Sequence, residues 1–468
     1  MSAMHSGKTS PPRASNKTGH WQAADARHHI HPFTDQHALK EKGVRVITHG
    51  EGIYVWDSEG NRLLDAMAGL WCCQLGYGNE ELVQAGAEAL RQLPYYNTFF
   101  QTTHPQVVEL GEKLAEITPE GLDTFFFANS GSEANDSAVK LIRYYWNLQG
   151  RKNKKIILSR NLSYHGTTMA AASLSGLPYM HPQFDLPLPG FEHVGPAPYW
   201  YDEGGDLSPD DFGLVVARAV ENAIVKLGPD NVAAFIGEPV MGAGGLIIPP
   251  DTYWQEVEKI CRKYDVLLWA DEVICGFGRT GAWFGCQTYG FQPDLITMAK
   301  GLSSGYQPIS ALALGPRMGE AINNAHEELE HGFTYSGHPV ACAVALRNIE
   351  IMQRLDLVGE TGRAVAAYFQ QKLGTLADHP LVGEVRGVGF LAAIEIVADK
   401  ATRRRFQDPG KAGSLCRDFC FQNGLIMRAV RDTMILSPPL ILSKLEVDEL
   451  VDAARRCLDL TAAELSKD

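Results

Sequence analysis

Short apolar runs and longer amphipathic stretches alternate along the chain, and the apolar runs end in Gly, Ser or Asp. This alternation is typical of an α/β fold. The runs are hydrophobic almost throughout, which indicates central parallel strands covered on both faces of one large sheet. The clearest predicted strands are Thr124 to Ala128, Lys155 to Leu158, Val232 to Ile236, Val266 to Ala270 and Asp294 to Met298.

Helical patterns connect these strands and have the length that a βαβ crossover needs. They cover Glu133 to Trp146, Phe212 to Lys226 and Trp254 to Lys263. Beyond Pro339 come a helical stretch to about Leu357, a strand-like run from Phe390 to Val397 and a final helix from Leu445, which indicate a second, smaller domain. The predicted segments are a tail (1–20), an N-terminal segment joining the small domain (21–70), a large domain (71–336) and a C-terminal small domain (337–468).

Length and charge exclude several classes of protein. The 468 residues suffice for about three domains, or two large ones, at roughly 150 residues per domain. A net charge of −13 leaves no basic footprint for nucleic acid. No uninterrupted apolar run reaches the roughly 20 residues that span a bilayer. We therefore expect a soluble protein with neither nucleic acid nor membrane as a partner.

The cellular location is predicted from the first residues and the cysteines. The first twenty residues are polar and rich in Pro and Ser, and they lack the apolar core of a secretory signal, which predicts a disordered tail. The nine cysteines are odd in number and include no C-x-x-C pair, which indicates reduced thiols rather than disulfides or a zinc site. A cytoplasmic location follows from both observations.

Residues that directly follow the apolar runs are candidates for a site, because parallel sheets bind ligands beyond the carboxyl ends of their strands. The small-residue turn Asn129 to Asn135 opens a helix, and its free backbone N–H groups predict a phosphate cup. Simple N-capping by a serine is the alternative. Asp271 places an acid after a second strand, and Lys300 follows a third, where desolvation favours a neutral, nucleophilic amine. Together the three match pyridoxal phosphate, which needs an anchored phosphate, a protonated ring nitrogen and a lysine for its aldehyde.

Three other motifs carry no predicted chemistry. Gly276 to Gly281 matches the dinucleotide pattern G-x-G-x-x-G, but Asp271 to Cys275 separates it from the strand. The histidines of His28 to His31 lack a Cys or acidic ligand cluster, so we expect a structural role near the site entrance rather than a metal site. Adjacent Cys72 and Cys73 would form a strained bridge and usually behave as small buried hydrophobes.

From about Trp21 to Leu458 the chain resembles the class III, pyridoxal-phosphate-dependent aminotransferases, specifically their pyruvate-linked omega-amine branch. The motifs that carry this resemblance are Asp65 to Trp71, Tyr96 to Phe100, Asn129 to Asn135, Tyr164-His-Gly166, Asp271 to Gly281, Met298 to Gly301, Gly332 to Pro339 and Gly424 to Arg428. The resemblance implies fold type I, which is aspartate aminotransferase-like, with a large, mostly parallel sheet domain and a smaller α+β domain.

The resemblance also implies roles for individual residues. Lys300 would bind the cofactor as a Schiff base and shuttle the reacting proton, while Asp271 would pair with the pyridinium nitrogen. Val273 and Tyr164 would lie on the two faces of the ring, supported by His165 and Glu238. Gly131 and Ser132, with Ser130 nearby, would bind the phosphate from one subunit and Thr334 from its partner, which makes a homodimer part of the site. Dimer and tetramer both stay open.

The substrate pocket follows from the same resemblance. Arg428 would swing inward to hold the carboxylate of pyruvate and outward for an amine donor, with Arg431 as the competing candidate. Trp71, Phe99, Phe100 from the partner subunit and Tyr164 would bound the donor's carbon chain, and core packing is the alternative for each.

The donor class is inferred from further segments of the chain. Leu186 to Gly190, Tyr199 to Tyr201 and Asp432 to Pro439 resemble transaminases that use putrescine or spermidine with pyruvate. The acidic protein would not repel such polycations. The expected products are an aldehyde and alanine. No metal is expected in the site.

Several other functions remain open at this point. Within the same fold, the donor could be an omega-amino acid such as β-alanine, taurine or 4-aminobutyrate. The same cofactor could also support racemisation or decarboxylation, which need no keto acceptor. A regulator that only binds the cofactor would need a DNA-binding segment, which the sequence before Trp21 does not offer. A dehydrogenase would depend on the Gly276 to Gly281 motif alone.

Overall fold

The computed structural model describes residues 17–467, and its centre is a seven-stranded sheet in the order β4-β10-β9-β8-β7-β5-β6. Only β10 runs antiparallel to its two neighbours, and the other pairs are parallel. The strands are β4 (Thr124–Ala128), β5 (Ile156–Arg160), β6 (Phe191–Val194), β7 (Val232–Gly237), β8 (Leu267–Asp271), β9 (Leu295–Met298) and β10 (Ser310–Leu314). The mostly parallel sheet agrees with the predicted fold class.

All five predicted strands are present, each within two residues of its predicted ends. The prediction that Thr124 to Ala128 is a central strand is wrong, because β4 lies at one edge of the sheet and pairs only with β10. Its phenylalanines contact the hydrophobic clusters on both faces of the sheet, so the strand is apolar without being central. The pattern also missed β6 and the antiparallel β10.

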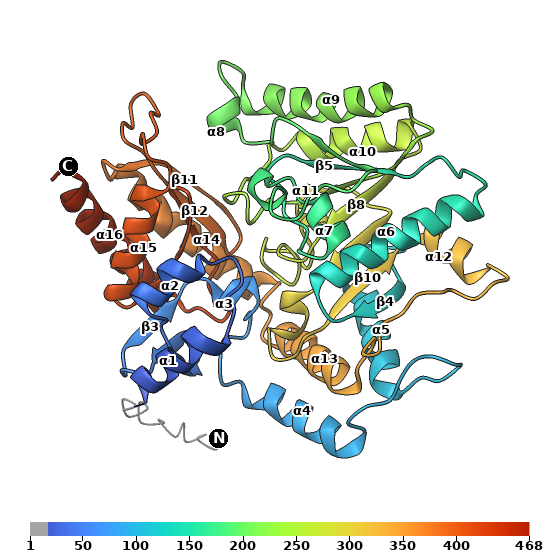
Figure 1. Cartoon of the computed structure of the whole chain (residues 1–468), viewed down its shortest axis with the longest axis horizontal. Helices are drawn as coiled ribbons and strands as arrows, with labels where there is room; N and C mark the ends of the chain where they lie inside the picture. The colour runs from blue at the N-terminus through green and yellow to red at the C-terminus, as the bar shows by residue number, and fades with distance from the viewer. Residues whose placement is uncertain (1–16, 468) are drawn as a thin grey trace.

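Helices cover both faces of this sheet (Figure 1). One face packs against α6 (Gly131–Leu148), α7 (Met169–Leu174) and α12 (Pro316–Asn323). The other packs against α5 (Pro105–Ile117), α9 (Pro209–Leu227), α10 (Tyr253–Lys263) and α13 (Pro339–Arg354). Strand β8 shows the alternation: Leu267 and Trp269 belong to the first cluster, whereas Leu268 and Ala270 belong to the second. Trp269 therefore packs in the core, and its indole N–H donates to Thr297 Oγ1 at 3.2 Å.

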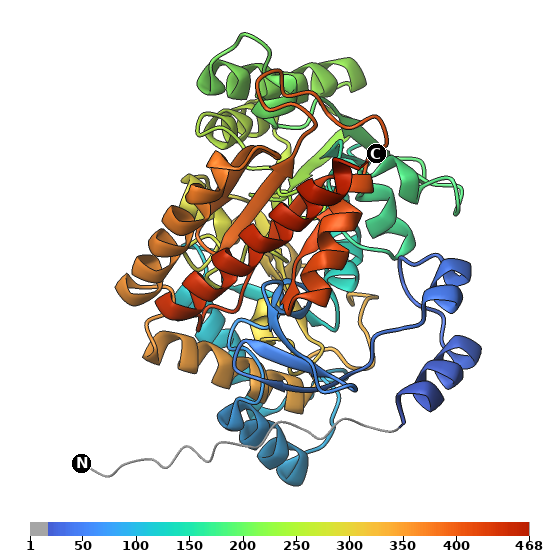
Figure 2. The ribbon, with the colours of Figure 1, turned by 90° about the vertical axis from the view of Figure 1, so that its left-hand side faces the viewer.

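The C-terminal part has its own antiparallel sheet in the order β11-β12-β15-β14. Its strands are β11 (Val382–Val388), β12 (Leu391–Ile396), β14 (Arg428–Val430) and β15 (Thr433–Leu436). Figure 2 shows the accompanying helices α14 (Glu360–Gly374), α15 (Lys411–Gln422) and α16 (Lys444–Leu465), of which α14 and α15 both contact α16. A separate core joins these helices to the sheet.

A third sheet, β1-β2-β3-β13, links the two ends of the chain. Strands β1 (Ile47–Glu51), β2 (Tyr54–Asp57) and β3 (Arg62–Asp65) come from the N-terminal segment, and β13 (Leu425–Ile426) pairs with β3 in parallel. The domain boundaries themselves stay a prediction. Most of the predicted tail lies outside the described residues, but its end does not: α1 (Thr18–His28) already begins at Thr18, so the prediction is wrong for residues 18–20.

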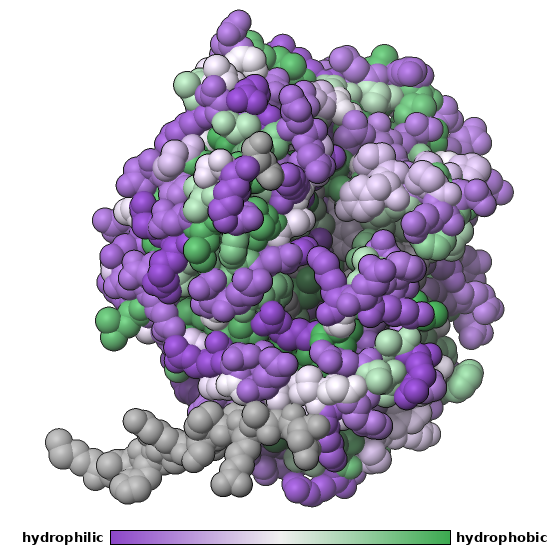
Figure 3. All heavy atoms as spheres, turned by 60° about the vertical axis from the view of Figure 1, so that its left-hand side comes forward, coloured by the Kyte–Doolittle hydropathy of each residue, from purple (hydrophilic) through white to green (hydrophobic). Residues whose placement is uncertain are grey.

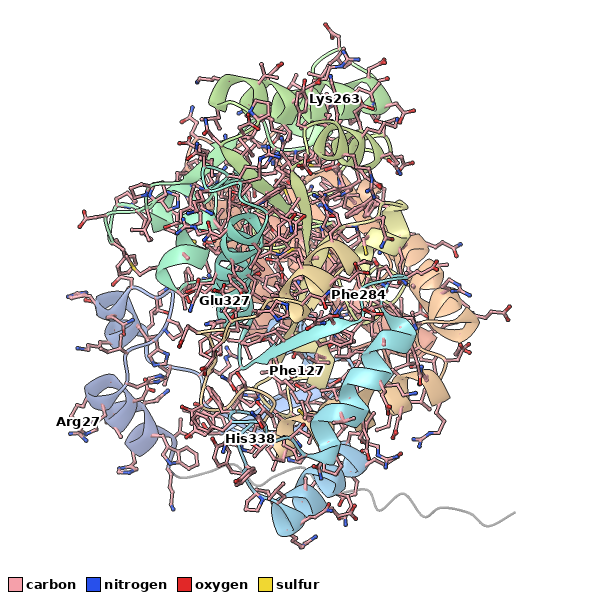
Figure 4. All side chains as sticks on the ribbon, turned by 90° about the vertical axis from the view of Figure 1, so that its right-hand side faces the viewer. Arg27, Phe127, Lys263, Phe284, Glu327 and His338 are labelled. Atoms are coloured by element: carbon pink, nitrogen blue, oxygen red, sulfur yellow. The ribbon has the colours of Figure 1, made fainter. Side chains whose placement is uncertain are left out.

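The remaining elements are short or peripheral. They are α2 (Gln36–Lys42), α3 (Ala68–Trp71), α4 (Glu80–Gln92), α8 (Trp200–Glu203), α11 (Gly285–Tyr289), and the 3-10 helices η1 (Pro178–Met180), η2 (Lys300–Ser303) and η3 (Thr375–Asp378). Between residues 17 and 467, none of the helices combines the length and apolarity that crossing a bilayer demands. Figure 4 shows two labelled cations on peripheral elements, Arg27 on α1 and Lys263 at the end of α10.

A buried arginine joins the C-terminal sheet to a loop of the central sheet domain. Arg386 of β11 donates to the carbonyls of Gly245 and Leu246 at 2.5 and 2.7 Å, and it pairs with Glu384 and Glu395 at 2.7 and 3.0 Å. Two backbone carbonyls and two carboxylates therefore compensate the buried positive charge of the Arg386 guanidinium.

Arg386→Met should destabilise the protein by about 3 kcal/mol, because it leaves buried Glu395 short of one cation and two backbone carbonyls without a donor. The apparent midpoint of urea unfolding measures this loss. Arg455→Met is the matched control, since its ion pair with exposed Asp378 should contribute less than about 1 kcal/mol. Equal losses in the two variants would contradict a special role for Arg386.

Candidate active site

A cavity of about 200 Å³ lies at the carboxyl edge of the central sheet, where strands β4, β5, β7, β8 and β9 all end. Parallel strands bring their carboxyl ends to one edge, so residues far apart in sequence meet there. Figure 3 shows a mostly hydrophilic face of the molecule with a recess near its centre. The residues that line the cavity are Ser130, Gly131, Ser132, Asn135, Tyr164, His165, Gly166, Glu238, Asp271, Val273, Ile274 and Lys300.

Lys300 begins η2 directly after β9 and has a left-handed backbone conformation, with φ of 46°. This conformation is strained for a residue with a side chain, and such strain collects at functional sites. Burial lowers the pKa of the Lys300 ammonium, and the nearby negative charge of Asp271 partly offsets the effect. No other described residue gives its Nζ a hydrogen bond or an ion pair. The structure thus presents a buried amine that is free to react.

Asp271 is the last residue of β8 and is held by three donors. Its Oδ2 lies 2.7 Å from His165 Nδ1 and accepts from Asn135 Nδ2 at 3.0 Å, while its Oδ1 accepts from the backbone N–H of Val273 at 3.1 Å. All of these side chains except that of Val273 are fully or almost fully buried. The carboxylate is therefore fixed in orientation and can neutralise a cation in the cavity.

The start of α6 forms the predicted anion site. Ser130 caps the helix by accepting from Glu133 N–H at 3.2 Å, so the capping alternative is correct for that side chain. The first N–H groups of the helix, those of Gly131 and Ser132, still adjoin the cavity. A Cβ on Gly131 would lie 3.0 Å from Val273 Cγ1 and would crowd that side chain, which also lines the cavity. This arrangement fits a bound phosphate.

Glu238 and Tyr164 lie on the β7 and β5 sides of the cavity. Burial raises the pKa of Glu238 to about 7, although its carboxylate accepts from the N–H groups of Tyr164 and Gly242 at 2.9 and 2.8 Å. These bonds fix the loop that carries Tyr164 and His165. The ring of Phe33, from the N-terminal segment, lies edge-on to Tyr164 with 6.2 Å between ring centroids.

Trp71 and Arg428 lie together beside the cavity without lining it. The guanidinium carbon of Arg428 lies 4.8 Å from the centroid of the Trp71 ring, within the range of a cation–π interaction. Burial lowers the pKa of Arg428, and no carboxylate in the described chain pairs with it. Trp71 itself is buried and has a φ of 60°. The competing candidate, Arg431, lies in the turn between β14 and β15.

Thr334, Phe99 and Phe100 do not reach the cavity of their own chain. Phe99 packs against Gly332, whose Cβ, if present, would lie 2.7 Å from the ring. Phe100 is 86% exposed and has a φ of 54°. Thr334 is exposed, and its carbonyl accepts from Tyr95 at 2.8 Å. Their predicted roles need a second subunit and stay predictions.

The three sequence motifs for which no chemistry was predicted have different environments in the structure. The glycines of Gly276 to Gly281 lie in turns, and buried Arg279 donates there to the carbonyls of Ser437 and Pro438, so no helix begins at the motif. The prediction that the histidines lack an acidic partner is wrong: Asp25 Oδ1 lies 3.1 Å from His29 Nδ1. Its Oδ2 lies 2.7 Å from His31 Nε2. Asp25 lies one helical turn before His29, and it was therefore not among the neighbouring residues considered as partners of the histidines. All nine cysteines are free thiols in the structure.

Sequence reasoning missed three residues that line the cavity, Asn135, Gly166 and Ile274, and the contact of Phe33 with Tyr164. Asn135 donates to Asp271 and to the carbonyl of His165, and its place one turn after Gly131 on α6 was a usable signal, because a buried amide in a helix needs a partner. Ile274 follows Val273 into the cavity lining. The contact of Phe33 with Tyr164 joins segments 131 residues apart and left no local signal.

The site residues fit the cofactor predicted from the sequence. Asn135 Oδ1 and His165 Nε2 are buried polar atoms without a partner in the described chain, next to a cavity that also holds an unpartnered amine. Such orphaned groups are rare in native proteins unless something binds them. An anion site, a fixed carboxylate and a reactive amine within one cavity can hold a phosphorylated aldehyde and move a proton beside it.

Comparison with known proteins identifies similar chains over nearly the full length. A family model described as aminotransferase class III matches residues 37–458. The putrescine–pyruvate aminotransferase of Pseudomonas aeruginosa is 55% identical over 447 residues, which cover 96% of this chain and 97% of that protein. Gamma aminobutyrate transaminase 3, chloroplastic, of Solanum lycopersicum is 43% identical over 90% of this chain and 81% of its own. The crystal structure of the omega transaminase of Pseudomonas jessenii in complex with PMP is 44% identical and matches with a TM-score of 0.93, over 95% of this chain and 99% of that one.

Proposed function

Because the chain belongs to the class III aminotransferase family, we propose that it transfers the amino group of a putrescine-like or spermidine-like amine to pyruvate, giving an aldehyde and alanine. The enzyme is a transaminase of fold type I, and its cofactor is pyridoxal 5′-phosphate. The observation that carries the proposal is the buried, unpaired amine of Lys300 facing the fixed carboxylate of Asp271 in one cavity.

Asp271 is proposed to keep the cofactor's ring nitrogen protonated. When bound, pyridoxal phosphate supplies an electron sink for the carbanion that forms at the substrate carbon. His165 and Asn135 hold the carboxylate of Asp271 in place. Val273 and Tyr164, which both line the cavity, are proposed to lie on the two faces of the ring. A fixed negative charge in a dry cavity favours a proton on the opposing nitrogen.

Lys300 is proposed to bind the cofactor and then to move the reacting proton. Its lowered pKa leaves a larger share of neutral amine than an exposed lysine has at the same pH, and a neutral Nζ can accept a proton from carbon. Tyr164 and Glu238 also line the cavity, and Glu238 acts by accepting from the backbone N–H of Tyr164 rather than on the substrate.

A homodimer is proposed to complete the phosphate site. The N–H groups at the start of α6 would bind the phosphate together with the partner subunit's Thr334. Two observations support this arrangement: Thr334 and Phe100 are exposed and lie outside their own cavity, and Tyr95, Tyr96 and Tyr335 are exposed aromatic residues of the same part of the chain. Large exposed aromatic residues are enriched at protein interfaces.

Arg428 is proposed to serve both half-reactions. Its guanidinium stacks on Trp71 and has no carboxylate partner, so it can take up the carboxylate of pyruvate as a bidentate pair. When an amine donor without a carboxylate binds, the stack on Trp71 stabilises the unpaired cation by about 0.5–2 kcal/mol.

Arg428→Ala should lower kcat/KM for pyruvate about 10- to 100-fold, since one charge-assisted hydrogen-bonding partner is lost. The half-reaction with the amine donor should keep nearly its normal rate, which rapid mixing of donor with holoenzyme measures directly. Arg431→Ala is the control and should leave both half-reactions unchanged. Equal loss in the two half-reactions would refute the selective role of Arg428.

Alanine formation from pyruvate tests the donor class. The panel consists of putrescine, cadaverine, spermidine, β-alanine, 4-aminobutyrate, taurine and 1-phenylethylamine. Fastest turnover with the diamines and spermidine is the expected result. The alternative donor is an omega-amino acid such as 4-aminobutyrate, which Arg428 could hold by its carboxylate and which is named for a relative at 43% identity. Absence of alanine with every donor would exclude pyruvate as the acceptor.

A cytoplasmic location is also proposed. It is supported by nine free thiols, because reduced cysteines persist in the cytosol and form disulfides in oxidising compartments.

A further inference from the structure

Two adjacent thiols directly follow Trp71 in the chain and share a niche between Gly69 and Gly305. The Sγ atoms of Cys72 and Cys73 lie 3.9 Å apart, Cys73 is buried, and Cys72 is half-buried. Gly69 and Gly305 wall the niche, and a Cβ on either glycine would approach both sulfurs to within 3.2–3.4 Å. Because both glycines have positive φ angles of 65° and 75°, the backbone there disfavours side chains that would fill the niche.

The geometry of this pair disfavours a disulfide and suits a single bridging atom. Neighbouring Cα atoms are about 3.8 Å apart, which is below the roughly 4.4–6.8 Å that disulfides span. The sulfurs would also have to approach to about 2.05 Å. In contrast, two thiolates bound by bonds of about 2.3 Å to one pyramidal atom with bond angles near 100° lie about 3.5 Å apart. The observed sulfur separation of 3.9 Å would therefore have to close by only about 0.4 Å for bridging, much less than for a disulfide.

The surroundings make Cys72 the reactive member. It donates or accepts the hydrogen bond with Cys73, and the positive charges of Lys300 and Arg279 act on it. The hydrogen bond from Cys73, offset in part by burial, lowers the pKa of Cys72 below its ordinary value. Arg279 is fully buried, and its Nε and Nη2 have no hydrogen-bond partner in the described chain, so its charge is poorly compensated. A thiolate at Cys72 relieves this imbalance.

We propose that Cys72 and Cys73 form a dithiol site that chelates a monosubstituted trivalent arsenical. Such a compound needs only two sulfur ligands, because its third valence is already taken by carbon. Zinc would need four ligands, and in residues 17–467 no group of three or more His, Cys, Asp or Glu side chains converges at this niche.

The reaction is a condensation without oxidation. Two arsenic–sulfur bonds form, the two S–H bonds and the arsenic–oxygen double bond of an arsenoxide break, and the oxygen leaves with both protons as one water molecule. Arsenic stays trivalent throughout. The resulting adduct lies beside Trp71 and within the electrostatic reach of Lys300, so it should also stop transamination. Only this last consequence rests on the proposed function.

Phenylarsine oxide added to the holoenzyme tests the site. Intact-mass measurement under native conditions should show one adduct per chain, and peptide mapping should locate it on the peptide with both cysteines. Cys72→Ala and Cys73→Ala should each weaken binding on the order of hundredfold, because a single thiol loses the gain of the second attachment. A dithiol such as 2,3-dimercaptopropanol should remove the adduct, whereas a monothiol should not.

Cys420→Ala is the matched control. Cys420 lies between Cys416 and Cys457 as part of another thiol cluster, but all three are fully buried, so the folded protein should not expose them to the reagent. An adduct that persists in Cys73→Ala, or that maps to Cys420, would overturn the proposal. Wild-type mapping decides the location even if a variant does not fold. If the untreated enzyme is inactive, the proposed function is refuted. The intact-mass measurement still tests the dithiol site in that case.

Discussion

Lys300→Ala should lower alanine formation by on the order of 10⁴-fold or more. The variant removes both the amine that attaches the cofactor and the base that moves the reacting proton, and a positioned acid–base group alone contributes about 10²- to 10⁴-fold. Steady-state alanine formation measures the rate. The visible absorbance that lysine-bound cofactor gives should be lost as well.

The control for this variant is Lys259→Ala on the surface of α10, where the ammonium is exposed and, within residues 17–467, pairs with Glu256 alone. It should retain the normal rate and absorbance. A Lys300→Ala variant with more than a tenth of the normal rate would place the reactive amine elsewhere. Retained activity would also require another reason for the buried, unpaired amine of Lys300.

Asp271→Asn should slow turnover about 10²- to 10⁴-fold while cofactor binding is retained. An amide keeps the shape and accepts the same hydrogen bonds at one oxygen, but it carries no charge to hold a proton on the ring nitrogen. Loss of a buried charge pair is worth about 3–5 kcal/mol, which converts to this range of rates. Single-turnover proton abstraction from a deuterated donor should show that the chemical step is the one slowed.

Asp294→Asn provides a matched comparison, because Asp294 is also a strand-terminal aspartate that accepts from a backbone N–H, at the opposite end of the sheet. Its substitution should leave the rate nearly unchanged. If both variants kept cofactor and turned over at normal rates, the carboxylate of Asp271 would have no electrostatic role in catalysis.

Hydrophobic pattern predicted the sheet well and its edges poorly. The strands that end in Asp271 and Lys300 were identified because burial on both faces leaves long apolar runs. The same signal misplaced Thr124 to Ala128, since helices on both faces can bury an edge strand. It missed β10, because Ser310 to Leu314 contains none of the β-branched or aromatic residues that favour strands. Strand order and direction depend on tertiary pairing, which no local window contains.

The site residues that directly follow strand ends could be predicted from the sequence. The contacts between residues far apart in the sequence could not. Gly131, Asp271 and Lys300 follow three strands, so topology alone places them together. The stack of Arg428 on Trp71 spans 357 residues and could be assigned only by resemblance. The contact of Asp25 with His31 was missed because it depends on where α1 ends.

The backbone at Lys300 has a consequence for how such a protein is maintained over evolutionary time. A left-handed φ of 46° is natural for glycine and unfavourable for lysine, and the side chain that it carries is a buried amine that burial destabilises. On folding grounds alone, random substitution would therefore tend to replace this residue. Selection for catalysis must continually oppose that drift, so a copy released from selection should lose its lysine before it loses its fold.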